Sequence, residues 1–103
     1  MKSFPQARVD LRSVDLGSEI LIYDERNDAV HLLNATARRI WQLCDGAHEV
    51  SDIVDEIGRL FPHVGATQVS DDVQRTLEQL TEKKIIVLAA DEVTEGDAGS
   101  RPD

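Results

Sequence analysis

The stretch from residue 29 to residue 46 constrains the fold most, because it contains every signal of a strand that runs directly into a helix. Residues 29–33 form a short apolar run, and Asn34 then offers a side-chain oxygen suited to a helix N-cap. The apolar residues that follow recur at the spacing of an amphipathic helix: Ala37, Ile40, Trp41 and Cys44. Gly46 then suits a helix stop, because glycine adopts the left-handed conformation readily. The stretch predicts a strand, a cap and a helix in sequence.

Two further strands are expected before this stretch. Residues 19–24 form a β-branched and aromatic run, and the polar residues 25–28 predict a turn, so 19–24 and 29–33 are expected to form an antiparallel hairpin. Residues 9–16 alternate imperfectly, which predicts a first strand with a break near Arg12. Residues 1–8 show no period and are expected to be a poorly fixed lead-in.

Helical patterns dominate the rest of the chain. A second helix is expected to start at Ser51 as N-cap and to end before Pro62, and a third to start at Thr67 or Ser70. A short strand, 85–88, follows. The expected fold is therefore α+β, a winged helix-turn-helix with a three-stranded N-terminal antiparallel sheet in the order β-β-β-α-α-α-β. The expected domain is 1–88, followed by an acidic disordered tail at 89–103.

The charge balance disfavours several classes of partner. The formal net charge of −9 repels phosphate backbones and anionic lipid surfaces, so neither nucleic acid nor a membrane is the expected partner. No apolar run approaches the roughly 20 residues that span a bilayer, and the N-terminus lacks the apolar region of a signal peptide. The single cysteine suits a reducing compartment, so the expected location is the cytoplasm.

A search for catalytic or metal-binding motifs gives little. His48-Glu49 begins a zinc-binding pattern, but Asp52 stands where the second histidine is needed. Cys44 lies on the apolar stripe and is expected to be a small buried side chain rather than a nucleophile. The acidic pairs stand at helix starts, where they complement the helix dipole. We therefore expect a non-enzyme without catalytic residues, metal or cofactor.

Two binding modes follow from the expected fold. In a DNA-binding winged helix the third helix enters the major groove, but here its start carries Asp71 and Asp72 with only Arg75 as a nearby base, which disfavours DNA. The edge of the strand 29–33 offers an alternative, because an extended peptide can add to it as a further strand. The residues alone leave open whether this strand is a binding edge or only part of the hairpin and core.

One long run has a specific pattern: Leu33-Asn34-x-Thr36-Ala37-x-x-Ile40-Trp41-x-Leu43-Cys44-Asp45-Gly46, preceded by the Tyr23-Asp24 strand. This pattern resembles the signature of the PqqD-like family. Downstream features agree with it in their spacing: Val50 with Ile53-Val54, the Asp72-Val73 pair, Leu77, Leu80 and Ile85-Ile86. The resemblance covers about residues 9–88.

The resemblance implies a RiPP recognition element, a non-catalytic chaperone for a ribosomally made precursor peptide. In such proteins the leader peptide adds antiparallel to the third strand, in the cleft beside the third helix. The module then delivers it to a tailoring enzyme such as a radical SAM protein or a peptidase/cyclase. Carried onto this chain, the peptide-binding residues are Ala29, Val30, His31, Leu32 and Leu33 of the strand, and Val69, Asp72, Val73, Thr76, Leu77, Gln79 and Leu80 of the helix.

One departure from the family and two further alternatives complete the expectations. The family usually has glycine where Lys84 stands, so this helix is expected to end with Lys84 in a left-handed conformation or with a longer last turn. A DNA-binding regulator of the same fold and a structural subunit of a larger enzyme complex are the alternative functions. The module is expected to be a monomer or a homodimer.

Overall fold

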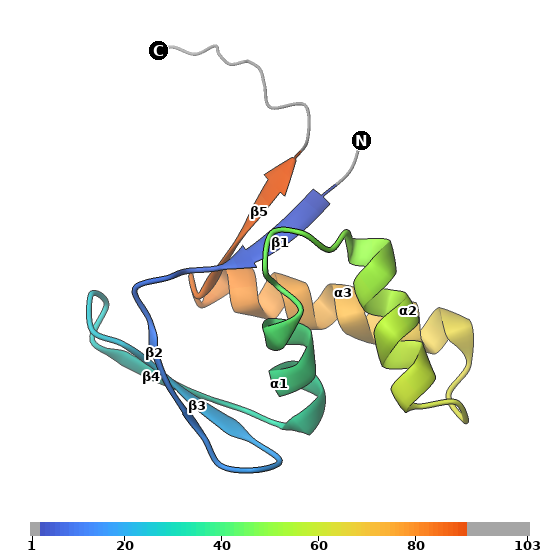
Figure 1. Ribbon diagram of the computed structural model, residues 1–103, viewed down its shortest axis with the longest axis horizontal. Helices are drawn as coiled ribbons and strands as arrows, with labels where there is room; N and C mark the ends of the chain where they lie inside the picture. Colours follow the sequence, from blue (N-terminus) through green and yellow to red (C-terminus); the bar gives the residue numbers. More distant parts are fainter. Residues whose placement is uncertain (1–2, 91–103) are drawn as a thin grey trace.

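A three-stranded antiparallel sheet packs against three helices, and a separate two-stranded sheet closes the other side (Figure 1). The computed structural model describes residues 3–90. Its elements are β1 (Ser3–Ala7), β2 (Arg12–Asp15), β3 (Ile20–Asp24), β4 (Ala29–Leu33), α1 (Ala35–Gln42), α2 (Val50–Leu60), α3 (Ala66–Glu82) and β5 (Ile86–Ala90). The predicted α+β class and the sheet of three strands before three helices are confirmed.

The three-stranded sheet has the order β2-β3-β4, so β2 and β4 are its two edges. Along β3 the inward positions Ile20, Ile22 and Asp24 are buried, as expected for a strand with one face on the core. The first strand of this sheet is shorter than the predicted 9–16, because only Arg12–Asp15 pair with β3. Val9 is 92% exposed and lies in the linker before β2.

The prediction of a poorly fixed lead-in was wrong for the residues that the structure describes. Residues Ser3–Ala7 form β1, which pairs antiparallel with β5 from Ser3↔Ala90 to Ala7↔Ile86. The carbonyl of Pro5 also accepts a hydrogen bond from the Gly46 N–H. A proline is tolerated there because β1 lies at the edge of a two-stranded sheet. β5 begins at Ile86 and ends at Ala90, two residues beyond the expected strand end at Leu88, and the rest of the expected tail lies outside the described residues.

The start of α1 was predicted correctly and the other two helix starts were not. The Asn34 side chain accepts a hydrogen bond from the Ala37 N–H at 2.9 Å. The N-cap of α2 is Glu49 rather than Ser51, because the Asp52 carboxylate reaches back to accept from the Glu49 N–H. The N-cap of α3 is Gly65 rather than Thr67 or Ser70, so the helix begins at Ala66.

Gly46 does not end α1 directly. The helix ends at Gln42 with Leu43 as its C-cap, and Gly46 lies three residues further on with a φ of 80°. Its conformation serves the contact with β1, because a Cβ at this position would lie 2.7 Å from the Gln6 side-chain oxygen. Gly46 is therefore needed for the close contact with β1 as well as for the turn after α1.

The core is aliphatic and lies between the three-stranded sheet and the helices. Its fully buried side chains come from every layer: Ile22 from β3, Ile40 from α1, Ile53 from α2, Val73 and Leu80 from α3, and Ile86 from β5. The predicted stripe of α1 holds in part, since Ile40 and Cys44 are buried whereas Trp41 packs against the core while only partly buried. α1 contacts both β4 and α3, so it fixes the strand and the helix relative to each other.

The end of α3 is a Schellman motif with a lysine at its left-handed position. Lys84 has a φ of 64°, its N–H donates to the Thr81 carbonyl, and the Ile85 N–H donates to the Leu80 carbonyl. This confirms the expectation that Lys84 replaces the usual glycine in a left-handed conformation. Non-glycine residues are disfavoured there because the Cβ crowds the following carbonyl.

Replacing Lys84 with glycine is therefore expected to stabilise the fold, by about 1 kcal/mol. Relief of the left-handed strain exceeds the added flexibility of the unfolded chain by roughly this amount. Lys83 is the matched control, because its φ is −76° and glycine there should destabilise the helix end. Urea unfolding of both variants measures the difference. A destabilising Lys84→Gly change would contradict the strain that we assign to this position.

Candidate functional site

The outer edge of β4 is the first component of the candidate site. Within residues 3–90, β4 pairs with β3 on one side and with no strand on the other. The side chains of β4 alternate: Val30 and Leu32 are 59% and 57% exposed, Ala29 and His31 are partly buried, and Leu33 is buried. A strand with an open edge presents N–H and C=O groups that an extended peptide can pair with.

The predicted helix residues divide into two groups on α3. Four are part of the hydrophobic core, and of these only Val69 also lines a surface pocket: Val69, Val73, Leu77 and Leu80. The other three lie at the surface, with Asp72 and Thr76 partly buried and Gln79 exposed. Their spacing places them on one flank of the helix. This surface flank is the part of α3 that remains in the candidate site.

A small apolar pocket lies between the first turn of α1, the end of α2 and the first turns of α3. Its volume is about 130 Å³, and it is lined by Thr36, Ile57, Phe61, Val64, Val69 and Asp72. Thr36 is three residues beyond β4, so the pocket lies where an added strand would pass the start of α1. The structure therefore brings Val69 and Asp72 together with Thr36, which follows β4 in the chain. Pockets of this kind, apolar with a few polar groups, fit a single side chain.

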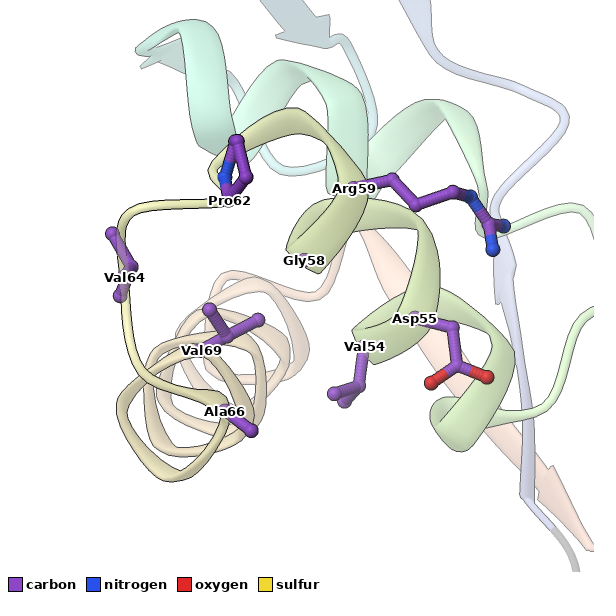
Figure 2. A pocket seen from close by; sticks show the side chains of 8 residues that line it. All are labelled: Val54, Asp55, Gly58, Arg59, Pro62, Val64, Ala66 and Val69. Carbon is purple, nitrogen blue, oxygen red and sulfur yellow. The ribbon is translucent and has the colours of Figure 1, made fainter.

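A second hollow adjoins this pocket on the other side of the loop between α2 and α3. Figure 2 shows its lining residues, with Val54 and Val69 on facing helices and Val64 on the loop. In this view the side chains of Asp55 and Arg59 extend along α2, away from Val64 and Val69. The hollow therefore lacks converging polar groups and extends the apolar surface next to Val69.

A buried ion pair holds α3 against the sheet. The guanidinium of Arg8 donates to both carboxylate oxygens of Asp24, at 2.8 and 3.2 Å, and also to the carbonyl of Lys84 at 2.9 Å. The Asn27 side-chain amide donates to Asp24 at 2.7 Å. These hydrogen bonds lower the pKa of Asp24 to about 2. We name Arg8, Asp24 and the Lys84 carbonyl the clasp, because they join the linker after β1, the end of β3 and the end of α3.

The other candidate chemistry groups do not converge. Among residues 3–90 no group of histidine, cysteine and acidic side chains is arranged to hold a metal ion. No helix in this part of the chain is long and apolar enough to cross a membrane. The Nδ1 of His48 lies 2.9 Å from Asp45 at the surface, and the Nε2 of His31 is buried with no hydrogen-bond partner in the described residues.

Cys44 is expected to react slowly with thiol reagents in the folded chain. It is 3% exposed, its thiol donates to the Ile40 carbonyl, and burial raises its pKa to about 12. At neutral pH almost no thiolate is present, and the thiolate is the reactive form. Labelling with a coloured disulfide reagent should be at least tenfold slower in buffer than in denaturant. Equal rates in the two conditions would contradict the burial of this thiol.

The sequence pattern missed several residues that shape the site. Three of the pocket's lining residues lie outside the predicted apolar stripes or at their ends: Thr36 in the first turn of α1, Phe61 at the end of α2 and Val64 in the loop that follows. Asp24 gave one usable signal, since it continues the inward alternation of Ile20 and Ile22 and so predicts a buried carboxylate in need of a partner. That partner, Arg8, could not be identified because it precedes the sheet and has no local pattern.

Comparisons with known proteins agree with this architecture. The family model described as coenzyme PQQ synthesis protein D (PqqD) matches residues 19–86, from the start of β3 to the first residue of β5. A search of curated proteins finds no match. The predicted resemblance to this family is confirmed, while β1 and β2 lie outside the matched segment.

Two solved structures share the fold. TbiB1, in complex with the TbiA(beta) leader peptide, is 23% identical with a TM-score of 0.73, and the match covers 84% of this chain and 99% of TbiB1. The heterocyclase TruD is 17% identical with a TM-score of 0.60, covering 89% of this chain and 12% of TruD. With the family model matching most of the described residues, the chain belongs to the PqqD family.

Proposed function

We propose that this chain is a non-catalytic peptide-binding module, a RiPP recognition element. It binds the leader of a ribosomally made precursor peptide as an added strand antiparallel to β4 and presents it to a modifying enzyme. The open edge of β4 within residues 3–90 is the observation that carries this proposal. Strand addition gives affinity through main-chain hydrogen bonds and specificity through pockets for alternate side chains.

The geometry beside β4 supports side-chain recognition in register. Successive residues of an added strand point to opposite faces of the sheet. Residues on one face would lie next to the exposed side chains of Val30 and Leu32. Residues on the other face would point toward the surface flank of α3, where Asp72, Thr76 and Gln79 are proposed to contact the leader. One apolar leader side chain would fill the 130 Å³ pocket beyond Leu33.

The solved relatives support both parts of the proposal. TbiB1 binds a leader peptide, and almost all of that chain is matched by this one. In TruD the same fold makes up a small part of a heterocyclase chain, which shows the fold joined to an enzyme in that protein. For this chain we propose a separate tailoring enzyme as partner, such as a radical SAM protein or a peptidase/cyclase, and a monomeric or homodimeric state.

Charge on the surface of α3 weighs against DNA as the alternative ligand. Asp71 is exposed, and Asp72 forms an ion pair with Arg75 at 3.1 Å, so the first turns of the helix offer no free cation. Phosphate contacts need such cations, and they make binding strongly salt-dependent.

The test is a titration of the full chain with labelled precursor peptides encoded in the same gene cluster. We expect saturable binding that depends weakly on salt, together with no measurable affinity for duplex DNA. An absence of saturable peptide binding would contradict the module. Co-purification with an enzyme in the absence of peptide affinity would instead support a structural subunit.

A further inference from the structure

We propose that a cationic groove at the far end of β4 binds an acidic side chain of the bound peptide. This inference rests on the proposed function and adds the charge pattern of the peptide. The groove has a volume of about 590 Å³ and is lined by Arg8, Arg26, Asn27, Thr81, Lys84, Ile86 and Val87. Its lining residues come from the β3–β4 turn, the end of α3 and the start of β5. Figure 1 shows the β3–β4 turn and the end of α3 at the left of the molecule.

The groove is lined by a lysine that forms no ion pair within residues 3–90. Every arginine of this part of the chain forms an ion pair with a carboxylate, and Lys83 and Lys84 do not. Of the two lysines only Lys84 lines the groove. Arg26 is 77% exposed and its ion pair with Asp10 is long, at 3.7 Å, so it also remains open to a ligand.

The carboxylates near the groove are already occupied. Asp24 is held by Arg8 and Asn27, and Asp10 accepts from Arg8 at 2.7 Å as well as lying near Arg26. Three cations line the groove, Arg8, Arg26 and Lys84, and no carboxylate does, in a chain with a formal net charge of −9. An anion is favoured at this point because the local charge has the opposite sign to that of the whole chain.

The conformation of Lys84 is an independent sign of a role for its side chain. A φ of 64° is unfavourable for lysine and natural for glycine, so a side chain is carried at a position where it costs stability. Strained positions of this kind gather at functional sites. The strained position places Lys84 in the lining of the groove.

The direction of the added strand fixes which part of the peptide reaches this groove. Asn27 precedes β4 and Thr36 follows it, so the groove and the apolar pocket lie at opposite ends of the strand. A peptide antiparallel to β4 would pass the pocket first and the groove last. The peptide should therefore carry its apolar anchor toward the N-terminal side and an acidic residue toward the C-terminal side.

The test is a selection of displayed random 15-residue peptides on the full-length chain. We expect acidic residues to be enriched on the C-terminal side of the apolar anchor in the selected peptides. Conversion of that acid to its amide should weaken binding about twofold to fivefold, the effect of an exposed ion pair. The same loss should appear with Lys84→Gln, and the two changes together should cost no more than either alone. Lys83→Gln is the matched control and should leave affinity unchanged.

The outcomes of this experiment distinguish the cationic groove from the proposed peptide-binding function on which it rests. Failure to select any peptide on the wild-type chain would contradict the proposed function itself. Selected peptides that lack the acidic preference would overturn only the role of the groove. The same conclusion would follow if the preference were present and Lys84→Gln left it intact.

Discussion

Replacing Arg8 with alanine is expected to destabilise the fold several times more than removing an exposed ion pair. The substitution leaves the Asp24 carboxylate, whose side chain is 1% exposed, with only Asn27 as a partner. A buried charge without its counter-ion is among the most destabilising changes that a single mutation can make. The loss also frees the Lys84 carbonyl, so the end of α3 should detach from the sheet.

Urea unfolding of three variants tests this expectation. Arg75→Ala is the control, because it breaks an exposed pair with Asp72 on one turn of α3 and should be nearly neutral. Combining Arg8→Met with Asp24→Leu should recover part of the stability that Arg8→Ala loses, because no unpaired charge then remains. Equal losses in Arg8→Ala and Arg75→Ala would show that the clasp does not hold the two sheets and α3 together.

The clasp also predicts how stability depends on acid. Hydrogen bonds from Arg8 and Asn27 lower the pKa of Asp24 from 3.8 to about 2 in the folded chain. A carboxylate with a lowered folded pKa stabilises the fold above its unfolded pKa, and that contribution is lost as the pH falls. The stability difference between wild type and Asp24→Asn should therefore be constant above about pH 4 and shrink between pH 4 and pH 2.

Proline at Val30 or Leu32 is expected to abolish peptide binding, with a loss of at least tenfold. The two residues have the same parity on β4, so their N–H groups point to the same side of the strand. Proline removes such a donor and its ring obstructs the approach of a further strand. Circular dichroism must show that each variant is folded. A titration with the labelled precursor peptide then measures the loss of affinity.

Val14→Pro provides the matched control for this experiment. Val14 lies on β2, the other edge of the same sheet, and is 55% exposed against 59% for Val30. A proline there perturbs an edge strand in the same way but is distant from the proposed peptide. Retained affinity in folded Val30→Pro and Leu32→Pro, or an equal loss in Val14→Pro, would place the peptide elsewhere.

Local signals in the sequence were sufficient for the elements whose causes are local. The hairpin of β3 and β4, the Asn34 cap and the three helices follow from neighbouring residues, and all are present. β1 could not be predicted because its partner β5 lies at the other end of the chain and a two-stranded pairing leaves no periodic trace. The starts of α2 and α3 were misplaced because Glu49, supported by Asp52, and Gly65 serve as the N-caps although better capping residues follow each of them.

The candidate site could be predicted only in part for the same reason. The residues alone left open whether the edge of β4 binds a peptide, and the positions on α3 came only from the resemblance to the PqqD-like family. That resemblance carried Val73 and Leu77 into the prediction, although both are buried in the core. The cationic groove could not be predicted, since Arg8 and Lys84 meet from positions 76 residues apart.

Amide hydrogen exchange along β4, measured by NMR with and without a bound precursor peptide, tests the central claim most directly. Strand addition predicts that the outward N–H groups of β4 become protected at alternate residues, while the already paired amides between β3 and β4 change little. Protection that appears on α2 or α3 alone, with β4 unchanged in the saturated complex, would contradict binding by strand addition at this edge.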